Sequence, residues 1–340
     1  MPVSDLRIHA RTRVAFTAMG LGCAQMGNLY RVTTYGEALG AFEASWAAGI
    51  RYFDTAPFYG FTRSERRLGT MLTDRPRGDY VVSTKVGRVM TPDPTVGEEE
   101  DGYVEPLPFR PVYDYSHDGV MRSFEASQQR LGILSPDILY VHDIGRVTHG
   151  DRHEHYWRQL TTGGGFAALA RLREQGCVKA IGLGVNEWQV VADALDAADL
   201  DVCMLAGRYT LLEQGSLAFM DKCAARGVGI VIAGAFNSGI LAGRTTFNYA
   251  AAPPEIVARV AALRLACEDE GVELEAAALQ FPLAHPAALT VVSGARTAAQ
   301  IEANVAWSEA AIPAAFWGRL KERGLIAEDA PVPVAPSSLS

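Results

Sequence analysis

The chain has 340 residues, of which 49% are hydrophobic and 21% are charged, a balance typical of a globular protein with a sizeable core. Its net charge of −8 excludes the basic footprint that nucleic acid or anionic lipid requires of a binding partner. No apolar run approaches the roughly 18 residues of a membrane helix, and the N-terminal MPVSDLRIHARTRV lacks the apolar stretch of a secretion signal, so we expect a cytoplasmic protein.

Apolar runs of strand length alternate with helical segments along the chain. Eight runs predict buried strands, at 17–23, 50–55, 80–86, 137–143, 178–185, 201–207, 229–235 and 288–294. Between them, segments such as 35–49 carry apolar residues at intervals of three and four, and several end in glycine, as helices prefer. This alternation predicts a single-domain (β/α)8 TIM barrel over residues 1–330. The last ten residues, PVPVAPSSLS at 331–340, are expected to be a disordered tail.

A doubly wound open sheet is the alternative arrangement for such a pattern. That fold usually announces its dinucleotide site by G-x-G-x-x-G after the first strand. The first predicted strand here does run into Gly20-x-Gly22, but the next glycine, Gly27, falls too late and no clear helix opens there. The barrel is therefore the better prediction.

Chemically active side chains fall at the carboxyl ends of neighbouring predicted strands, which in a barrel face one shared mouth. Asp54 ends the second strand, Tyr59 lies on the loop after it, Lys85 ends the third strand and His142 ends the fourth. Taken singly, a lysine or histidine at a strand end is more often solvated or half-buried than catalytic. Four such residues at aligned strand ends predict an active site.

These four residues suit proton exchange with an oxygen on carbon. A tyrosine has an ordinary pKa near 10, which a nearby lysine ammonium is expected to lower, while an aspartate holds the lysine in place. A histidine can orient the substrate oxygen by a hydrogen bond. Neither a nucleophile nor a metal cluster accompanies this set, and protein side chains cannot supply a hydride. We therefore expect a nicotinamide nucleotide across the barrel mouth.

The last predicted strand and helix carry the expected trace of that cofactor. A small-residue turn at 293–295, which includes Gly294, precedes a helix whose first backbone N–H groups suit a phosphate, with Arg296 adding charge. Gln300 and Asn304 lie four positions apart on one helix face, where they suit an adenosine. An ordinary capped helix with a surface arginine explains this spacing equally well.

Two long loops follow the third and fourth predicted strands, at 87–117 and 144–165, and loops of this length are usually functional or disordered. Both are expected to overhang the mouth. Four residues are candidates to contact the substrate, although a place in the core is the more common role for each: Met26, Phe58, Tyr115 and Trp157. His153 and His155 have a spacing seen in metal sites, but no carboxylate supports them. Five scattered cysteines show no Cys-x-x-Cys spacing, so we expect neither a metal nor a disulfide.

Several stretches together resemble the aldo-keto reductase superfamily over nearly the whole chain: GLGCAQMGNLY, GIRYFDTAPFYG, SERRLG, STKVGR, ILYVHD, VKAIGLGVNEW and SGARTAAQIEAN. The resemblance implies a (β/α)8 barrel that binds NAD(P)H in an extended form without a Rossmann domain. It implies that Tyr59 is the proton donor or acceptor, that Lys85 and Asp54 tune it, and that His142 orients the substrate. Asn186 matches the residue that holds the nicotinamide carboxamide.

The chain also departs from the family pattern. Val185 stands where a serine is common, and Ala206 stands where a glutamine is usual. GAFNSGILAG lacks the usual tyrosine-serine-proline run, but it keeps Phe236 to stack on the nicotinamide. Ser238, Gly239 and Leu241 complete the cofactor contacts expected from this segment.

The nucleotide preference follows from two further departures. Strict NADPH members often carry a lysine at the position of Gly294 and an arginine at that of Gln300, and this chain has neither. NAD is therefore expected at least as readily as NADP, while Arg296 leaves NADP open.

Phrases such as GNLY, YVHDIG, LAGRYTLLEQ and AFNSGIL resemble the branch with D-threo-aldose 1-dehydrogenases (L-fucose and galactose dehydrogenases) and pyridoxal 4-dehydrogenase. The resemblance implies oxidation of the hemiacetal C1 of an aldose to a lactone, with a small-molecule sugar or aldehyde as the substrate; the sequence does not give the oligomeric state. Oxidation of pyridoxal to 4-pyridoxolactone is the alternative within the branch. A general NADPH carbonyl reductase, or a non-catalytic nucleotide-binding regulatory subunit, remains open beside these.

Overall fold

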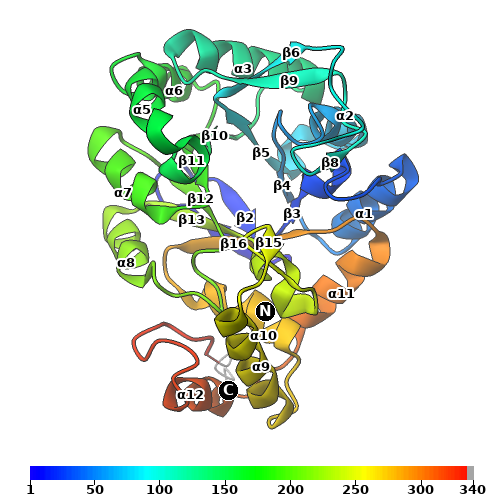
Figure 1. The fold of residues 1–340 in the computed structure, drawn as a ribbon, viewed down its shortest axis with the longest axis vertical. Helices are drawn as coiled ribbons and strands as arrows, with labels where there is room; N and C mark the ends of the chain where they lie inside the picture. The colour runs from blue at the N-terminus through cyan, green and yellow to red at the C-terminus, as the bar shows by residue number, and fades with distance from the viewer. Residues whose placement is uncertain (335–340) are drawn as a thin grey trace.

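The computed structural model of the protein describes residues 1–334. Eight parallel strands close into a barrel and follow one another around it: β3 (Met19–Gly22), β4 (Tyr52–Asp54), β5 (Val81–Val86), β10 (Ile138–His142), β11 (Ala180–Val185), β12 (Val202–Ala206), β13 (Gly229–Ala233) and β16 (Ala288–Gly294) (Figure 1). Each strand coincides with a predicted apolar run. The predicted single-domain (β/α)8 barrel is thus confirmed.

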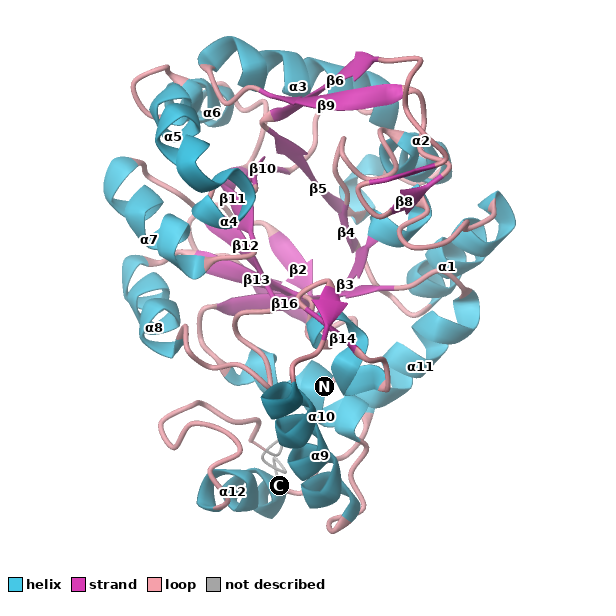
Figure 2. Ribbon diagram, viewed as in Figure 1, coloured by secondary structure: helices cyan, strands magenta, loops and turns pink. Residues whose placement is uncertain are grey.

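Helices surround the barrel on all sides (Figure 2). The ring consists of α1 (Tyr35–Ala47), α2 (Arg63–Leu72), α3 (His117–Leu131), α6 (Gly165–Glu174), α7 (Trp188–Ala197), α8 (Leu217–Arg226), α10 (Leu274–Gln280) and α11 (Ala298–Glu309). Local sequence sets their ends: Thr34 caps α1 in a capping box with Glu37, and Gly132 ends α3 in the left-handed conformation. Outside the ring, α9 (Pro254–Glu268) lies beside α12 (Ala314–Glu322). Val332 packs against the core, beyond the expected end of the barrel at 330, and residues 335–340 lie outside the described part.

An N-terminal hairpin closes the lower end of the barrel. Strands β1 (Leu6–Ile8) and β2 (Ala15–Thr17) pair antiparallel. Val14 and Phe16 are buried in one cluster with residues at the amino ends of the barrel strands, including Tyr52 and Ile138. The ring of Phe16 meets that of Tyr52 edge-on at 5.0 Å. Because these side chains fill the bottom, the barrel opens only at the carboxyl ends of its strands within the described residues.

The loops at the open end carry their own secondary structure. Segment 87–117 forms two antiparallel pairs, β6 (Arg88–Pro92) with β9 (Phe109–Tyr113) and β7 (Glu99–Glu100) with β8 (Tyr103–Val104). Segment 144–165 contains α4 (Arg146–His149), η3 (Gly150–Arg152) and α5 (His153–Leu160). A third extension pairs β14 (Thr246–Phe247) with β15 (Ala250–Ala251). The remaining short helices are η1 (Cys23–Gly27), η2 (Arg77–Asp79), η4 (Asn237–Ala242) and η5 (Phe281–Ala284). Both long loops are therefore folded.

In residues 1–334, no helix combines the length and apolar character that crossing a membrane demands. The same residues hold no group of three or more His, Cys, Asp or Glu side chains placed to bind a metal ion. His153 Nδ1 instead contacts the Ile144 carbonyl at 3.1 Å, and His155 Nε2 contacts Gln159 at 3.2 Å.

Candidate active site

A buried ion pair lies under the barrel mouth. Lys85 Nζ donates to both oxygens of Asp54, at 2.9 and 2.7 Å, and to the Thr55 carbonyl at 2.9 Å. Parallel pairing of β4 with β5 sets Asp54 opposite Ser83, whose hydroxyl donates to Asp54 at 2.7 Å. Burial raises the pKa of Asp54, and Lys85 and Ser83 oppose that rise. The pair is thus fully hydrogen-bonded, as buried charges must be.

The hydrogen bonds continue downward into the barrel. The Tyr52 hydroxyl lies 2.9 Å from Ser83 Oγ and 3.2 Å from the Tyr140 hydroxyl. We call Asp54, Ser83, Tyr52 and Tyr140 the hydroxyl column. The hydroxyl groups of the column hold the Asp54 carboxylate from below, while Lys85 binds the same carboxylate from above.

Tyr59 and His142 complete the group above the ion pair. Lys85 Nζ lies 4.7 Å from the centre of the Tyr59 ring, and that ring meets the His142 ring edge-on at 5.9 Å. Tyr59 is half-buried, whereas Asp54, Lys85 and His142 are buried. The structure therefore brings together the four residues that the sequence singled out, Asp54, Tyr59, Lys85 and His142, which we call the tetrad.

The protonation states differ from expectation in one respect. The pKa of Tyr59 lies well above its ordinary value because of burial first, and then because of Asp54 and Asp143. The expected lowering by Lys85 is not seen, since the charge of Lys85 is directed at Asp54. Burial, with Arg88 and Lys85, holds the pKa of His142 well below its ordinary value. The protein by itself therefore presents a neutral phenol beside a neutral imidazole.

Two glycines set the position of the Tyr59 backbone. A Cβ on Gly27 would lie 2.5–2.7 Å from backbone atoms of Tyr59 and Gly60. Gly60 has a φ of +64°, and a Cβ there would lie 2.2 Å from the Gly27 carbonyl oxygen. Gly27, which is too late for a dinucleotide fingerprint, thus serves to let the Tyr59 loop approach η1.

Gly27→Ala is expected to push the Tyr59 loop out of place. Overpacking of this kind costs about 1–3 kcal/mol, and a displacement of about 1 Å in a catalytic group can cost a hundredfold in rate. Urea unfolding and turnover would measure the two effects. Gly36→Ala is the matched control, because nothing lies within 4 Å of a Cβ on that helical glycine. Unchanged turnover by Gly27→Ala would contradict the proposed packing.

The sequence analysis missed a second ion pair beside His142. Arg88 Nη2 donates to Asp143 Oδ2 at 2.5 Å, and His142 Nε2 lies 3.4 Å from the same oxygen. The guanidinium carbon of Arg88 lies 4.0 Å from the centre of the Phe58 ring. Asn186 Nδ2 donates to Asp143 Oδ1 at 3.2 Å. Arg88 ends STKVGR, close to Lys85, and Asp143 ends ILYVHD, next to His142. This closeness in the sequence was the signal that could have indicated the ion pair.

Asn186, expected to hold the nicotinamide carboxamide, is also held by the β14–β15 turn. The Tyr249 hydroxyl donates to Asn186 Oδ1 at 3.2 Å. Ser238 Oγ accepts from the Tyr249 backbone N–H at 3.1 Å. The turn therefore bridges two of the residues expected to contact the cofactor.

The segment after β13 has an unusual backbone. Ser238 and Gly239 have φ values of +60° and +98°, in the left-handed region. Leu241 is fully buried, so its side chain serves the core. Phe236 is half-buried and meets Trp307 edge-on at 6.2 Å.

The residues expected to hold the adenosine end are engaged within the protein. Arg296 is 4% exposed; its guanidinium donates to the Leu29 carbonyl, and to Thr33 Oγ1 at 2.9 Å. Gln300 Oε1 accepts from the Arg296 backbone N–H at 2.8 Å. Asn304 is buried and donates to Ser293 at 2.8 Å. Arg296 is thus a buried arginine, where the sequence suggested an exposed one.

The surroundings of Gly294 nevertheless fit an anionic nucleotide. Burial first, and then Arg31 and Arg244, lower the pKa of Arg296 to about 10, so three cations gather here. A Cβ on Gly294 would lie 2.3–2.7 Å from the Gln25 carboxamide. Gln25 Oε1 is buried without a hydrogen-bond partner in the described part of the chain. The clustered cations, the exposed backbone of Gly294 and the unpaired Gln25 carboxamide together suit a pyrophosphate with its ribose.

Only one of the four substrate candidates lies where a substrate can reach it. Phe58 is half-buried, between Arg88 and the His142 ring at 6.1 Å. Met26 and Tyr115 are fully buried, and the Tyr115 hydroxyl donates to the His142 carbonyl at 2.8 Å. Trp157 stacks on His153 in α5. Tyr115 thus supports the His142 backbone, whereas Met26 and Trp157 pack within the protein.

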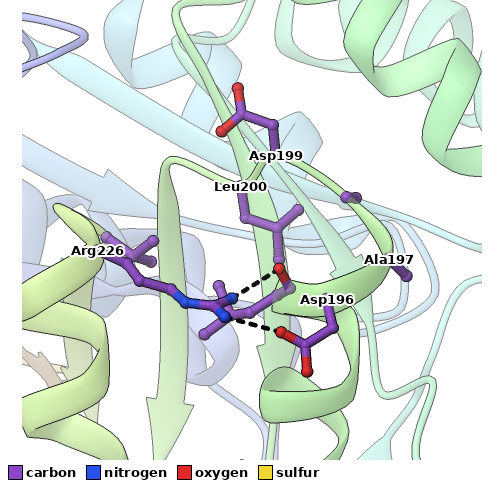
Figure 3. Close-up of a pocket in the computed structure, with 8 residues that line it drawn as sticks. Asp196, Ala197, Asp199, Leu200 and Arg226 are labelled. Carbon is purple, nitrogen blue, oxygen red and sulfur yellow. Dashed lines mark hydrogen bonds and ion pairs between the residues drawn. The ribbon is translucent and has the colours of Figure 1, made fainter.

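A surface pocket lies at the other end of the barrel (Figure 3). It is lined by 195–200 together with Arg226 and Val228, just before β12 and β13 begin. Arg226 donates to the Leu195 carbonyl and to Asp196, each at 2.9 Å. Its position at the amino ends of the strands separates it from the tetrad.

Comparison with known proteins agrees with this geometry. The profile of the Aldo/keto reductase family matches residues 18–324. The chain is 51% identical to the pyridoxal 4-dehydrogenase of Microbacterium luteolum, over 96% of this chain and 99% of that protein. It is 40% identical to a D-threo-aldose 1-dehydrogenase of a Pseudomonas species, over 93% and 97% respectively.

Solved structures show the same fold. An aldo-keto reductase from Bacillus halodurans, in its holo form, has a TM-score of 0.71 at 22% identity and covers 98% of both chains. The glycerol dehydrogenase of Gluconobacter oxydans has a TM-score of 0.71 at 18% identity over the whole of both chains. From its sequence, barrel and catalytic geometry, the chain belongs to the aldo/keto reductase family and is an oxidoreductase.

Proposed function

We propose that the protein oxidises a cyclic hemiacetal to a lactone with a nicotinamide nucleotide. The observation that carries this proposal is the half-buried Tyr59, whose ring lies beside His142 and 4.7 Å from Nζ of the buried Lys85–Asp54 pair. The names of the two relatives support it, because pyridoxal and aldoses share one reacting group. Pyridoxal closes through its neighbouring hydroxymethyl group and an aldose closes to a pyranose, so each offers a C–H and an O–H on one carbon.

Pyridoxal is the first candidate substrate, since the relative named for it shares 51% identity with this chain. An aldose such as L-fucose or D-galactose is the second, supported by the relative at 40%. The tetrad serves either substrate without change. A nucleotide would be held by the backbone at Ser238–Gly239, the cations around Arg296 and the open edge at Gly294.

The bound nucleotide would supply the hydride acceptor, which amino-acid side chains cannot provide. Tyr59, as phenolate, takes the proton of the hemiacetal hydroxyl, so that the carbon–oxygen double bond of the lactone forms as the hydride departs. His142 is neutral and orients the reacting oxygen by a hydrogen bond. Lys85 neutralises Asp54, whose negative charge would otherwise oppose the Tyr59 phenolate.

We propose NAD as the preferred nucleotide. The Arg296 guanidinium is committed to the 29–33 segment, and Gln300 is committed to the Arg296 backbone. These contacts leave neither side chain turned toward an adenosine 2′-phosphate. NADP gains affinity from cations that bind its 2′-phosphate. Without such a cation at the positions of Gly294 and Gln300, NADP loses that advantage, and no carboxylate that repels the phosphate is needed.

Oxidation is expected to rise with pH. The raised pKa of Tyr59 makes phenolate the minority form at neutral pH, so the rate should increase about tenfold per pH unit until that pKa is reached. Reduction of the product uses the phenol, and should stay level over the same range before it falls. Initial rates in both directions would test this, with circular dichroism to confirm that the protein stays folded. A level profile for oxidation would contradict the role of Tyr59.

NADH formation at 340 nm with pyridoxal, L-fucose, D-galactose and D-arabinose, each with NAD and NADP, tests the function. Turnover of pyridoxal or a sugar with NAD supports the proposal and identifies the substrate. Turnover of open-chain aldehydes alone, in the reductive direction with NADPH, would favour a general carbonyl reductase. Nucleotide binding by calorimetry without turnover of any substrate would favour a regulatory subunit.

A further inference from the structure

The Arg88–Asp143 ion pair is largely buried, although the proton transfer by the tetrad does not use it. The side chains of Arg88 and Asp143 are 6% and 14% exposed. Desolvating such a pair often costs as much as its attraction returns, so stability alone does not explain it. Asp143 also has a φ of +47°, in a region that residues other than glycine seldom adopt. Strain of this kind, beside a catalytic residue, is typical of a binding site.

The pair has hydrogen-bonding capacity to spare. A guanidinium offers five N–H donors and a carboxylate accepts about four hydrogen bonds. Arg88 Nε is buried and has no partner among the described residues. Asp143 accepts from Arg88 and Asn186. A bound molecule would meet a guanidinium and a carboxylate side by side, at the 6% and 14% of these side chains that stay exposed.

The pair adjoins the reacting centre. Asp143 Oδ2 lies 3.4 Å from His142 Nε2, the edge of the imidazole that faces the pair. Arg88 covers Phe58, and the Phe58 ring meets the His142 ring. Arg88, Phe58 and His142 thus form one continuous wall. A substrate whose reacting carbon lies at Tyr59 and His142 would have its neighbouring atoms along this wall.

We propose that Arg88 and Asp143 bind an oxygen that the substrate carries one or two carbons away from its reacting carbon. Arg88 donates a hydrogen bond to this oxygen, and Asp143 accepts one when the oxygen bears a proton. In an aldopyranose the oxygen is the C2 hydroxyl, which satisfies both partners. In pyridoxal it is the ring C3 oxygen, which as a phenolate satisfies Arg88 alone. The inference rests on the proposed function and names the part of the hemiacetal that is recognised.

A cycle of variants and deoxy substrates tests this. The wild type, Arg88→Met and Asp143→Asn would be assayed with D-galactose against 2-deoxy-D-galactose, and with pyridoxal against 3-deoxypyridoxal. Loss of a charge-assisted hydrogen bond predicts that the wild type prefers each parent over its deoxy analogue by about 10- to 100-fold in kcat/KM. In Arg88→Met the preference should fall below about threefold, because the group that reads the oxygen is gone. Asp143→Asn should reduce the preference with the sugar, where Arg88 still donates, and keep it with pyridoxal, which distinguishes the two sources.

Arg66→Met is the matched control, since Arg66 covers the Phe109 ring at 5.9 Å on the neighbouring loop. It should leave every preference unchanged. Arg88→Lys, which keeps the charge and loses the fork, tests the same point if the methionine variant fails to fold. Turnover by the wild type with equal preferences in wild type and Arg88→Met would overturn this inference alone. No turnover of any hemiacetal by nucleotide-bound wild type would overturn the proposed function, and this inference with it.

Discussion

Tyr59→Phe is expected to slow hydride transfer by about two to four powers of ten, the usual contribution of a general acid or base. The substitution removes one oxygen atom and leaves the ring against His142 and above Lys85. Nucleotide affinity should therefore change little. Single-turnover absorbance at 340 nm would measure transfer, and fluorescence titration with NADH would measure binding.

Tyr209→Phe is the matched control for that change. Tyr209 is buried and its hydroxyl has no hydrogen-bond partner in the described residues, so its removal should affect neither rate nor binding. Hydride transfer by Tyr59→Phe at the wild-type rate would disprove the mechanism. A parallel loss of nucleotide binding would instead show that the ring had moved.

Lys85→Met is expected to have the largest effect on stability. It leaves Asp54 without its cation in a site where Asp54 is 3% exposed. Breaking a buried ion pair in this way costs about 3–5 kcal/mol in the free energy of unfolding. Turnover should fall as well, because the unneutralised Asp54 charge then opposes the Tyr59 phenolate. Urea unfolding monitored by circular dichroism would give the stability change.

Two further variants separate charge from packing. Lys179→Met removes a 60% exposed lysine that pairs with Asp137 at 2.8 Å, and should cost less than about 1 kcal/mol. Adding Asp54→Asn to Lys85→Met removes the unpaired charge, and should recover much of the lost stability without restoring turnover. If the double variant were no more stable than Lys85→Met, burial of charge would not be the cause.

The fold and the tetrad could be predicted because both depend on local pattern. A buried parallel strand is a short apolar run, and the carboxyl ends of the barrel strands meet at one mouth. Asp54 and His142 end such runs and Lys85 is next to last in its own, so their meeting needed no knowledge of loop structure. Tyr59 follows Asp54 closely enough that one turn decides its place.

The remainder of the site depends on how loops fold over one another, which periodicity does not encode. Arg88 and Asp143 are 55 residues apart, and they meet because one follows β5, the other follows β10, and these two strands pair in the barrel. Arg296 is buried only because the 29–33 segment lies across it. Tyr115 likewise could face a substrate or the core until the position of α4 and α5 is known.

The closed bottom of the barrel has a consequence for proton traffic. The hydroxyl column ends below at Tyr140 and Tyr52, where Phe16 lies against Tyr52 and is itself fully buried. Water therefore reaches the column through the mouth, past Tyr59. On the proposed function, a substrate seated there would separate the column from the solvent, so the proton that Tyr59 takes would leave only after the lactone. Product first and proton second, both would return to the solvent through the mouth of the barrel.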